Sequence, residues 1–127
     1  MAVIVCGVLA MPIGAVWYGP IFGKAWMKEI GKTEDEIREG FNPAKTYSLA
    51  FIGHLVVALV LAYFLSLTGA QSVADSVRVS LTAWVGFVGA TMFINGLFSG
   101  ISTRLFMINS GYFVMILLVY GIILGLW

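Results

Sequence analysis

Charged residues are scarce in this sequence. They make up only 10% of its 127 residues, and all but Asp75, Arg78 and Arg104 fall between residues 24 and 45. With 61% hydrophobic residues and a mean hydropathy of +1.01, the remainder is too apolar for a water-soluble domain. A net charge of +1 with mixed signs offers no clustered basic surface, which argues against a nucleic-acid partner. The composition predicts an integral membrane protein surrounded by the lipid bilayer.

Cysteine and histidine are also rare, with one of each. Cys6 has no disulfide partner in the chain, and in an apolar run its thiol should behave as a small hydrophobe. His54 and one distant cysteine cannot complete a metal site, so we expect no metal and no cofactor. No recognised nucleophile motif is present, and the apolar runs hold none of the carboxylates that usually serve ion-coupled pumps. These absences argue against an enzyme and against a coupled pump, and leave a neutral-solute path or an uncoupled pore open.

Four apolar segments are each long enough to cross a hydrocarbon layer, which takes about 20 residues. They predict an all-α, single-domain membrane bundle of four helices in which short links make successive helices antiparallel neighbours. The first segment lacks the positive n-region of a secretory signal, so we expect it to be retained. The four predicted spans are residues 2–22, 44–67, 77–98 and 108–127.

The connection between the first two spans carries helix signals of its own. Thr33 and Glu36 have the spacing of a capping box, and Gly40 follows, which predicts a short cytoplasmic surface helix. Asn42 and Pro43 suit the N-cap and first turn of the second span. The mixed charges of this connection fit a solvated surface, with a partner-binding helix as the alternative.

Lysine and arginine are distributed unevenly between the connections. Six of the seven lie in or beside the first and third connections, and only Arg78 belongs to the second. The positive-inside rule therefore predicts that the first and third connections are cytoplasmic and that both termini lie on the opposite side. The six are Lys24, Lys28, Lys32, Arg38, Lys45 and Arg104.

Small residues recur at helical spacing on the first, third and fourth spans. In lipid, such residues let helix backbones approach closely, where dispersion and interhelical hydrogen bonds drive association. Four helices can cover only some of these faces internally, so the others predict a homo-oligomer or docking onto a larger membrane complex. In the first span, Pro12 should introduce a bend. The candidate helix-packing residues are Gly7, Ala10, Gly14, Gly86, Gly89, Ala90, Gly121 and Gly125.

Several polar side chains lie inside or at the ends of the spans: Thr91 and His54 at similar depths, Tyr18, Asn95 and Asn109 nearer the cytoplasmic border, and Arg104 at that border. At 1.5 Å per residue, His54 lies roughly 14 Å from the start of its span, near the middle of a layer about 30 Å thick. One interpretation is a cytoplasm-facing pocket in which His54 accepts a proton or binds a ligand. The other is interhelical hydrogen bonding that fixes helix register, at roughly 0.6 kcal/mol per bond. The candidate pocket residues are Tyr18, His54, Thr91, Asn95, Arg104 and Asn109.

An aromatic border marks the end of the first span, where the sequence reads WYGPIFGKAWM from Trp17 to Met27. Amphipathic rings prefer the headgroup level, which makes Trp17 and Trp26 candidate interfacial anchors. Tyr18 continues the small-residue stripe of the first span, so we expect it to face protein.

Together with Trp84, Phe87, Gly111 and Tyr112, this run resembles the small bacterial membrane proteins grouped as domain of unknown function 1761. The resemblance extends over nearly the whole chain and implies a four-helix protein, which we expect in the bacterial inner membrane. It implies no activity, substrate or catalytic residue. From the residues we expect a non-enzymatic structural or accessory protein that oligomerises or docks on a larger membrane complex. A small-solute channel or carrier with a cytoplasm-facing polar pocket is the alternative.

Overall fold

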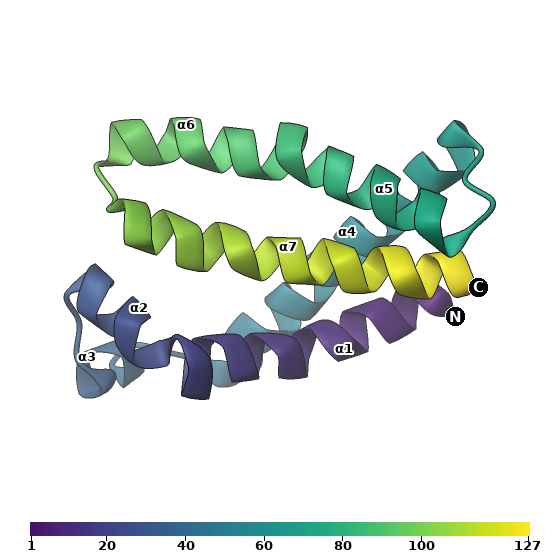
Figure 1. Cartoon of the computed structure of the whole chain (residues 1–127). Coiled ribbons are helices and arrows are strands. Elements are labelled where there is room, and N and C mark those ends of the chain that lie inside the picture. The colour runs from purple at the N-terminus through teal and green to yellow at the C-terminus, as the bar shows by residue number, and fades with distance from the viewer.

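The computed structural model describes all 127 residues as helices and short links, with no strands. Four helical stretches are long and apolar enough to cross a membrane, which confirms the predicted all-helical architecture with four candidate spans. Figure 1 shows both termini at one end of the molecule, with the short helices α2 and α3 and the link between α6 and α7 at the other. The four stretches are Ala2–Ile21, Pro43–Thr68, Val73–Ser99 and Thr103–Leu126.

Nine helical elements make up the chain, because two of the long stretches contain a π-helical turn and two short helices follow the first stretch. In chain order they are α1 (Ala2–Val16), η1 (Trp17–Ile21), α2 (Gly23–Ile30), α3 (Glu34–Arg38), α4 (Pro43–Thr68), α5 (Val73–Ala83), η2 (Trp84–Gly89), α6 (Ala90–Ser99) and α7 (Thr103–Leu126).

Local sequence sets where the helices begin. The Thr33 hydroxyl accepts from the Glu36 backbone N–H at 3.2 Å, and the Glu36 carboxylate accepts from the Thr33 backbone N–H at 2.9 Å. These two bonds form the capping box that starts α3. Asn42 starts α4 by accepting from the Lys45 backbone N–H at 3.1 Å. Pro43 occupies the first turn of α4, where the helix makes no use of an N–H.

The helix α7 is the centre of the bundle. It lies between α5 and α1, and α4 packs against α1 (Figure 1). Glycines allow the close approach of α5: a Cβ on Gly121 would lie 2.6 Å from Ser80 Oγ, and one on Gly125 would lie 2.9 Å from Val73 Cα. This glycine pair therefore forms an internal contact between two helices of the same chain.

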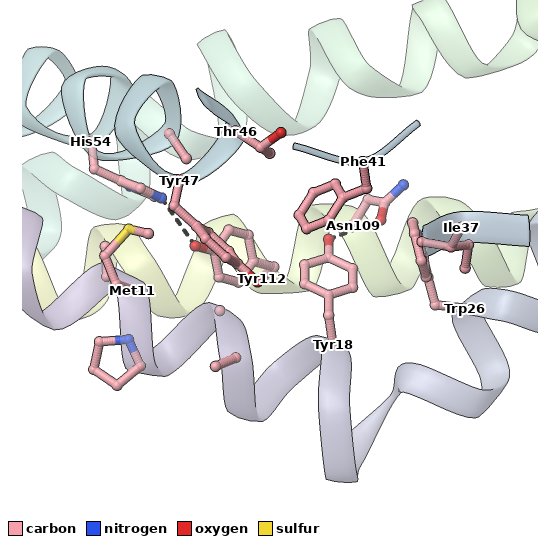
Figure 2. Close-up of a pocket in the computed structure, with 15 residues that line it drawn as sticks. Met11, Tyr18, Trp26, Ile37, Phe41, Thr46, Tyr47, His54, Asn109 and Tyr112 are labelled. Carbon is pink, nitrogen blue, oxygen red and sulfur yellow. Dashed lines mark hydrogen bonds between the residues drawn. The ribbon is translucent and has the colours of Figure 1, made fainter. Parts of the chain in front are cut away.

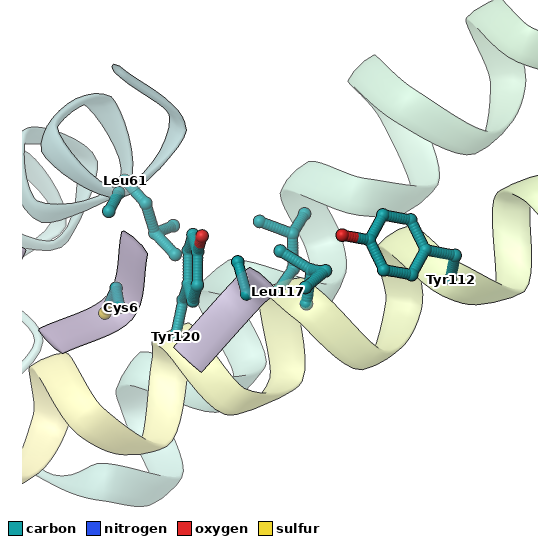
Figure 3. Close-up of a cluster of buried hydrophobic side chains, with 8 residues drawn as sticks. Cys6, Leu61, Tyr112, Leu117 and Tyr120 are labelled. Atoms are coloured by element: carbon teal, nitrogen blue, oxygen red, sulfur yellow. The ribbon is translucent and has the colours of Figure 1, made fainter. Parts of the chain in front are cut away.

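The opposite face of α7 contributes much of the buried core (Figure 3). Tyr112, Ile116 and Tyr120 stand four residues apart and so share one face of the helix. The eight buried side chains of this core are Cys6, Ala10, Ala58, Leu61, Tyr112, Ile116, Leu117 and Tyr120.

Two π-helical turns widen the long stretches, and each begins at a tryptophan. In η1 the wide turn accommodates Pro20, which has no N–H to donate and whose ring would clash with the carbonyl four residues earlier in an α-helix. In η2 the indole of Trp84 lies over Gly89, where a Cβ would be 2.9 Å from the ring. Pro12 lies within α1, and the helix continues beyond it to Val16.

Candidate functional site

A pocket of about 1080 Å³ lies between α1, α4 and α7 and extends to α2 and α3 (Figure 2). Its size is that of a pocket for a whole organic molecule. Ten of its fifteen lining residues are hydrophobic and none carries a formal charge at neutral pH with histidine neutral. The lining residues are Ala10, Met11, Pro12, Gly14, Ala15, Tyr18, Trp26, Ile37, Phe41, Thr46, Tyr47, Ala50, His54, Asn109 and Tyr112.

Small residues of α1 both close the bundle and leave room for the pocket. A Cβ on Gly7 would lie 2.7 Å from the Leu55 side chain, so α1 and α4 are in close contact there. One turn on, Ala10 is fully buried in the core and also lines the pocket. At Gly14, a Cβ would lie 3.2 Å from the hydroxyl of Tyr112. The predicted small-residue stripe therefore faces protein, and its Gly14 end opens the space in front of α7.

His54 joins two tyrosines of α7 at the inner end of the pocket. Its Nε2 atom lies 3.1 Å from the Tyr112 hydroxyl, and its Nδ1 atom lies 3.0 Å from the Tyr120 hydroxyl. Tyr120 is 0% exposed and Tyr112 is 8% exposed, whereas His54 is half-buried. Both ring nitrogens of His54 are therefore engaged, and we call this group the Tyr112–His54–Tyr120 chain.

Tyr18 and Asn109 form a second polar pair in the pocket. The Tyr18 hydroxyl donates to the Asn109 side-chain oxygen at 2.9 Å. The Tyr18 ring packs edge-on against Tyr112 and Trp26, with centroid distances of 5.4 and 5.7 Å. Three of the six predicted pocket residues, Tyr18, His54 and Asn109, thus line one pocket.

The other three predicted pocket residues lie elsewhere. The Thr91 hydroxyl donates to backbone carbonyls of its own helix at 2.6 and 3.0 Å and is exposed. Asn95 is also exposed, on α6. Arg104 lies at the start of α7, 4.0 Å from the Glu29 carboxylate of α2. The sequence grouped these residues by helix face and by distance from the cytoplasmic border, but neither property fixes how a helix is rotated toward its neighbours.

The predicted packing residues of the third span lie in different environments. Gly89 lies under the Trp84 ring of the same chain. Gly86 has no atom within 4 Å of where its Cβ would lie, and it is exposed, as is Ala90. Among the predicted packing residues of the third span, Gly86 and Ala90 are therefore exposed and Gly89 is buried.

Tryptophan indoles hold α7 from two sides. The indole N–H of Trp17 donates to the backbone carbonyl of Ile108 at 3.0 Å, and that of Trp84 donates to the carbonyl of Ser110 at 3.2 Å. A Cβ on Gly111 would lie 3.1 Å from the Trp17 ring, so this glycine makes room for it. Trp17 therefore faces α7, although the sequence suggested a headgroup anchor. Trp26, the other suggested anchor, lines the pocket.

Sequence reasoning missed Tyr112 and Tyr120 as partners of His54. The signal was present, because both tyrosines share with Asn109 one face of the fourth span, and they stand two helical turns apart. It also missed Phe41 and Tyr47, which line the pocket and pack edge-on with ring centroids 5.9 Å apart. These two belong to the link before α4 and to its first turn, where spacing does not indicate orientation.

Comparison with known proteins identifies a family but no role. Neither a curated protein nor a solved structure shows significant similarity to the chain. One family model, described as "Protein of unknown function (DUF1761)", matches residues 1–125. Because this match covers nearly the whole sequence, the chain belongs to the DUF1761 family.

Proposed function

We propose that this protein binds an uncharged small solute in the pocket between α1, α4 and α7, and that it acts as a carrier of that solute at the membrane. The observation that carries the proposal is a pocket of about 1080 Å³, without charged lining residues, among helices apolar enough to span a bilayer. Packing alone requires no space of this size, because helix interiors are normally filled to the density of organic crystals.

The mainly apolar, uncharged lining determines which class of solute fits the pocket. An ion without a partner of opposite charge is costly to bring among apolar side chains, whereas a largely apolar molecule with a few hydrogen-bonding atoms matches this surface. At its inner end the pocket is lined by Ala10 and His54, and core residues such as Leu61 and Tyr120 are not part of the lining. This arrangement favours a carrier over an open channel, because transfer across the membrane requires helices to move. The proposed role involves no chemical reaction.

The distribution of positive charge supports a cytoplasmic mouth in the bacterial inner membrane. Helices α2 and α3, which border the pocket, lie in the connection that holds most of the lysines. A reporter fused after Trp127 tests this orientation. Alkaline phosphatase, which needs the periplasm, should be active there, and green fluorescent protein should be dark. A fluorescent C-terminal fusion with inactive phosphatase would reverse the orientation.

Methionine methyl groups provide a direct binding assay. Met11 lines the pocket, whereas Met107 is 63% exposed on α7 and reports on surrounding lipid. In lipid nanodiscs with ¹³C-labelled methionine methyls, an uncharged aromatic probe such as duroquinone should shift the Met11 signal saturably. It should shift Met107 only in proportion to its concentration in the lipid. Equal, unsaturable shifts at both methyls would contradict the proposal.

A pair of variants on α4 provides the control. Ala50 lines the pocket, and Ala44, six residues earlier on the same helix, does not. Ala50→Phe should fill the pocket and abolish the saturable shift at Met11, whereas Ala44→Phe should preserve it. In liposomes, the unmodified protein should accelerate equilibration of the probe and Ala50→Phe should not.

A second candidate role, as an accessory protein that oligomerises or docks on a larger membrane complex, is favoured by one observation. Asn95 is exposed on α6, and a polar group facing lipid favours association with another helix; Gly86, earlier in the same long stretch, is exposed as well. Asn95→Leu combined with Gly86→Leu should then reduce the native mass in mild detergent to that of a monomer. An unchanged mass would remove this role and leave the carrier proposal intact.

A further inference from the structure

The hydroxyl protons of the Tyr112–His54–Tyr120 chain can be assigned from burial. The Tyr120 hydroxyl is 0% exposed, and His54 Nδ1 is its hydrogen-bonding partner at 3.0 Å. A hydroxyl proton left without an acceptor in an apolar interior is strongly disfavoured. Tyr120 therefore donates to Nδ1, which must be the unprotonated nitrogen of the ring.

This assignment determines the remainder of the chain of bonds. A neutral imidazole carries its proton on one nitrogen, so when Nδ1 accepts, Nε2 is the protonated atom. Nε2–H then donates to the Tyr112 oxygen, 3.1 Å away. The hydroxyl proton of Tyr112 is consequently not used by His54, and Tyr112 lies on the pocket wall.

Asn109 supplies a second donor to the same space. Its side-chain oxygen accepts the Tyr18 hydroxyl proton at 2.9 Å, which orients the amide. Its amide nitrogen makes no hydrogen bond within the chain, and Figure 2 shows that nitrogen on the side away from Tyr18. The pocket thus presents two uncharged donors, Tyr112 O–H and Asn109 N–H.

The walls around these donors are aromatic. Tyr47 lines the pocket beside Tyr112, and Tyr18, Phe41 and Trp26 line it toward the α2–α3 end (Figure 2). Aromatic faces and edges pack well against a flat ring. Two donors without charge suit acceptor oxygens that are themselves uncharged, such as carbonyl oxygens.

We propose that the pocket recognises an uncharged, carbonyl-bearing flat ring of the quinone type, whose oxygens accept hydrogen bonds from Tyr112 and Asn109 while its ring packs among the aromatic walls. The chain through His54 is the positioning device, because the buried Tyr120 hydroxyl sets the tautomer that turns the Tyr112 proton toward the pocket. This inference rests on the proposed binding function and specifies its ligand.

The first experiment measures the tautomer. His54 is the only histidine of the chain, so in protein without a histidine tag the ¹⁵N signals of its ring are unambiguous. Protonated and unprotonated ring nitrogens have well-separated shifts. The expected result is a proton on Nε2 and none on Nδ1 in the ligand-free protein in nanodiscs. A proton on Nδ1 would overturn the inference, because Tyr112 would then donate to His54 and not to a ligand.

The second experiment compares duroquinone with durene, the hydrocarbon that has the same four methyl groups and no carbonyls. Neither probe has the open quinone position at which thiols add, so Cys6 stays unmodified. Titrations are followed at the Met11 methyl, with concentrations corrected for partition into lipid. Duroquinone should bind at least several-fold more tightly than durene, because one hydrogen bond typically changes affinity by a factor of about 2 to 10.

A variant tests whether the preference for duroquinone depends on the Tyr112 hydroxyl. Tyr112→Phe removes one hydroxyl and keeps the ring, so duroquinone affinity should fall by a factor of about 2 to 10 while durene affinity is unchanged. Tyr63→Phe is the matched control, since Tyr63 is 62% exposed on α4 and outside the pocket. Should Tyr112→Phe unfold, the comparison of the two probes in the unmodified protein still decides the question.

The outcomes separate the two proposals. Equal affinities for duroquinone and durene would overturn the ligand inference and leave a binding pocket for apolar solutes. If neither probe shifts the Met11 signal saturably, the binding function and the inference are both overturned.

Discussion

Two glycines in long helices should respond oppositely to the same substitution. At Gly121 of α7, a Cβ would lie 2.6 Å from Ser80 Oγ, 3.1 Å from Val77 Cα and 3.2 Å from the Ser76 carbonyl oxygen. At Gly86 of η2, no atom lies within 4 Å of that position. Gly121→Ala should therefore destabilise the bundle, and Gly86→Ala should not.

The difference between the two variants isolates helix packing. The gain in helix propensity from glycine to alanine is about 1 kcal/mol at both sites and cancels in the comparison. Two of the three contacts at Gly121 are backbone atoms of α5, so the new methyl forces the helices apart. The Ser80 hydroxyl is held by its own bond to the Ser76 carbonyl at 2.7 Å. Overpacking of this kind destabilises by about 1 to 3 kcal/mol, and this is the expected difference in unfolding free energy.

Reversible unfolding in mixed micelles, followed by tryptophan fluorescence at increasing SDS, measures this difference. Native mass in mild detergent is measured in parallel. If α5 is the partner of Gly121, then Gly121→Ala lowers stability without changing the native mass. Equal stability of the two variants would refute the close α5–α7 contact, and a lower mass for Gly121→Ala alone would indicate an interface between chains.

Three further substitutions test individual contacts. His54→Leu leaves the buried Tyr120 hydroxyl without an acceptor and should lower the unfolding free energy by about 1 to 3 kcal/mol, with Tyr63→Phe as a neutral reference. Thr33→Ala removes the N-cap of α3, which should destabilise that helix by about 1 kcal/mol. Amide exchange should then accelerate in α3 while the global unfolding free energy is unchanged. Faster exchange throughout the chain would contradict a local role. Trp17→Phe removes the bond to the Ile108 carbonyl and should destabilise by about 0.5 to 1.5 kcal/mol, whereas Trp127→Phe, at a residue 71% exposed, should have no effect.

Features encoded within one helix could be predicted from the sequence. The capping box of Thr33 and Glu36 depends on residues three apart, and the cap at Asn42 is equally local. The four apolar stretches follow from hydropathy, because each must satisfy its backbone hydrogen bonds alone in lipid.

Relations between helices were harder to predict, because they depend on how each helix is rotated about its axis. Periodicity placed Thr91 and Asn95 on one face of the third span, and Thr91 at the depth of His54, yet both residues are exposed on α6 and lie outside the pocket. Trp17 was ambiguous for a similar reason: an amphipathic ring at a span end fits the headgroup region, and it fits a carbonyl of a neighbouring helix equally well. Only the position of α7 decides between these environments.

The bonds from the two tryptophans explain why the pocket donors have a fixed direction. The carbonyls of Ile108 and Ser110 flank Asn109, and they accept indole protons from Trp17 of η1 and Trp84 of η2. Rotation or sliding of α7 would break both bonds, so this turn of the helix is held against the first and third stretches at once. Asn109 and Tyr112, three residues apart on that turn, are thereby held facing α4 and the pocket. A carrier built in this way would release its solute by moving α4 against a fixed α7.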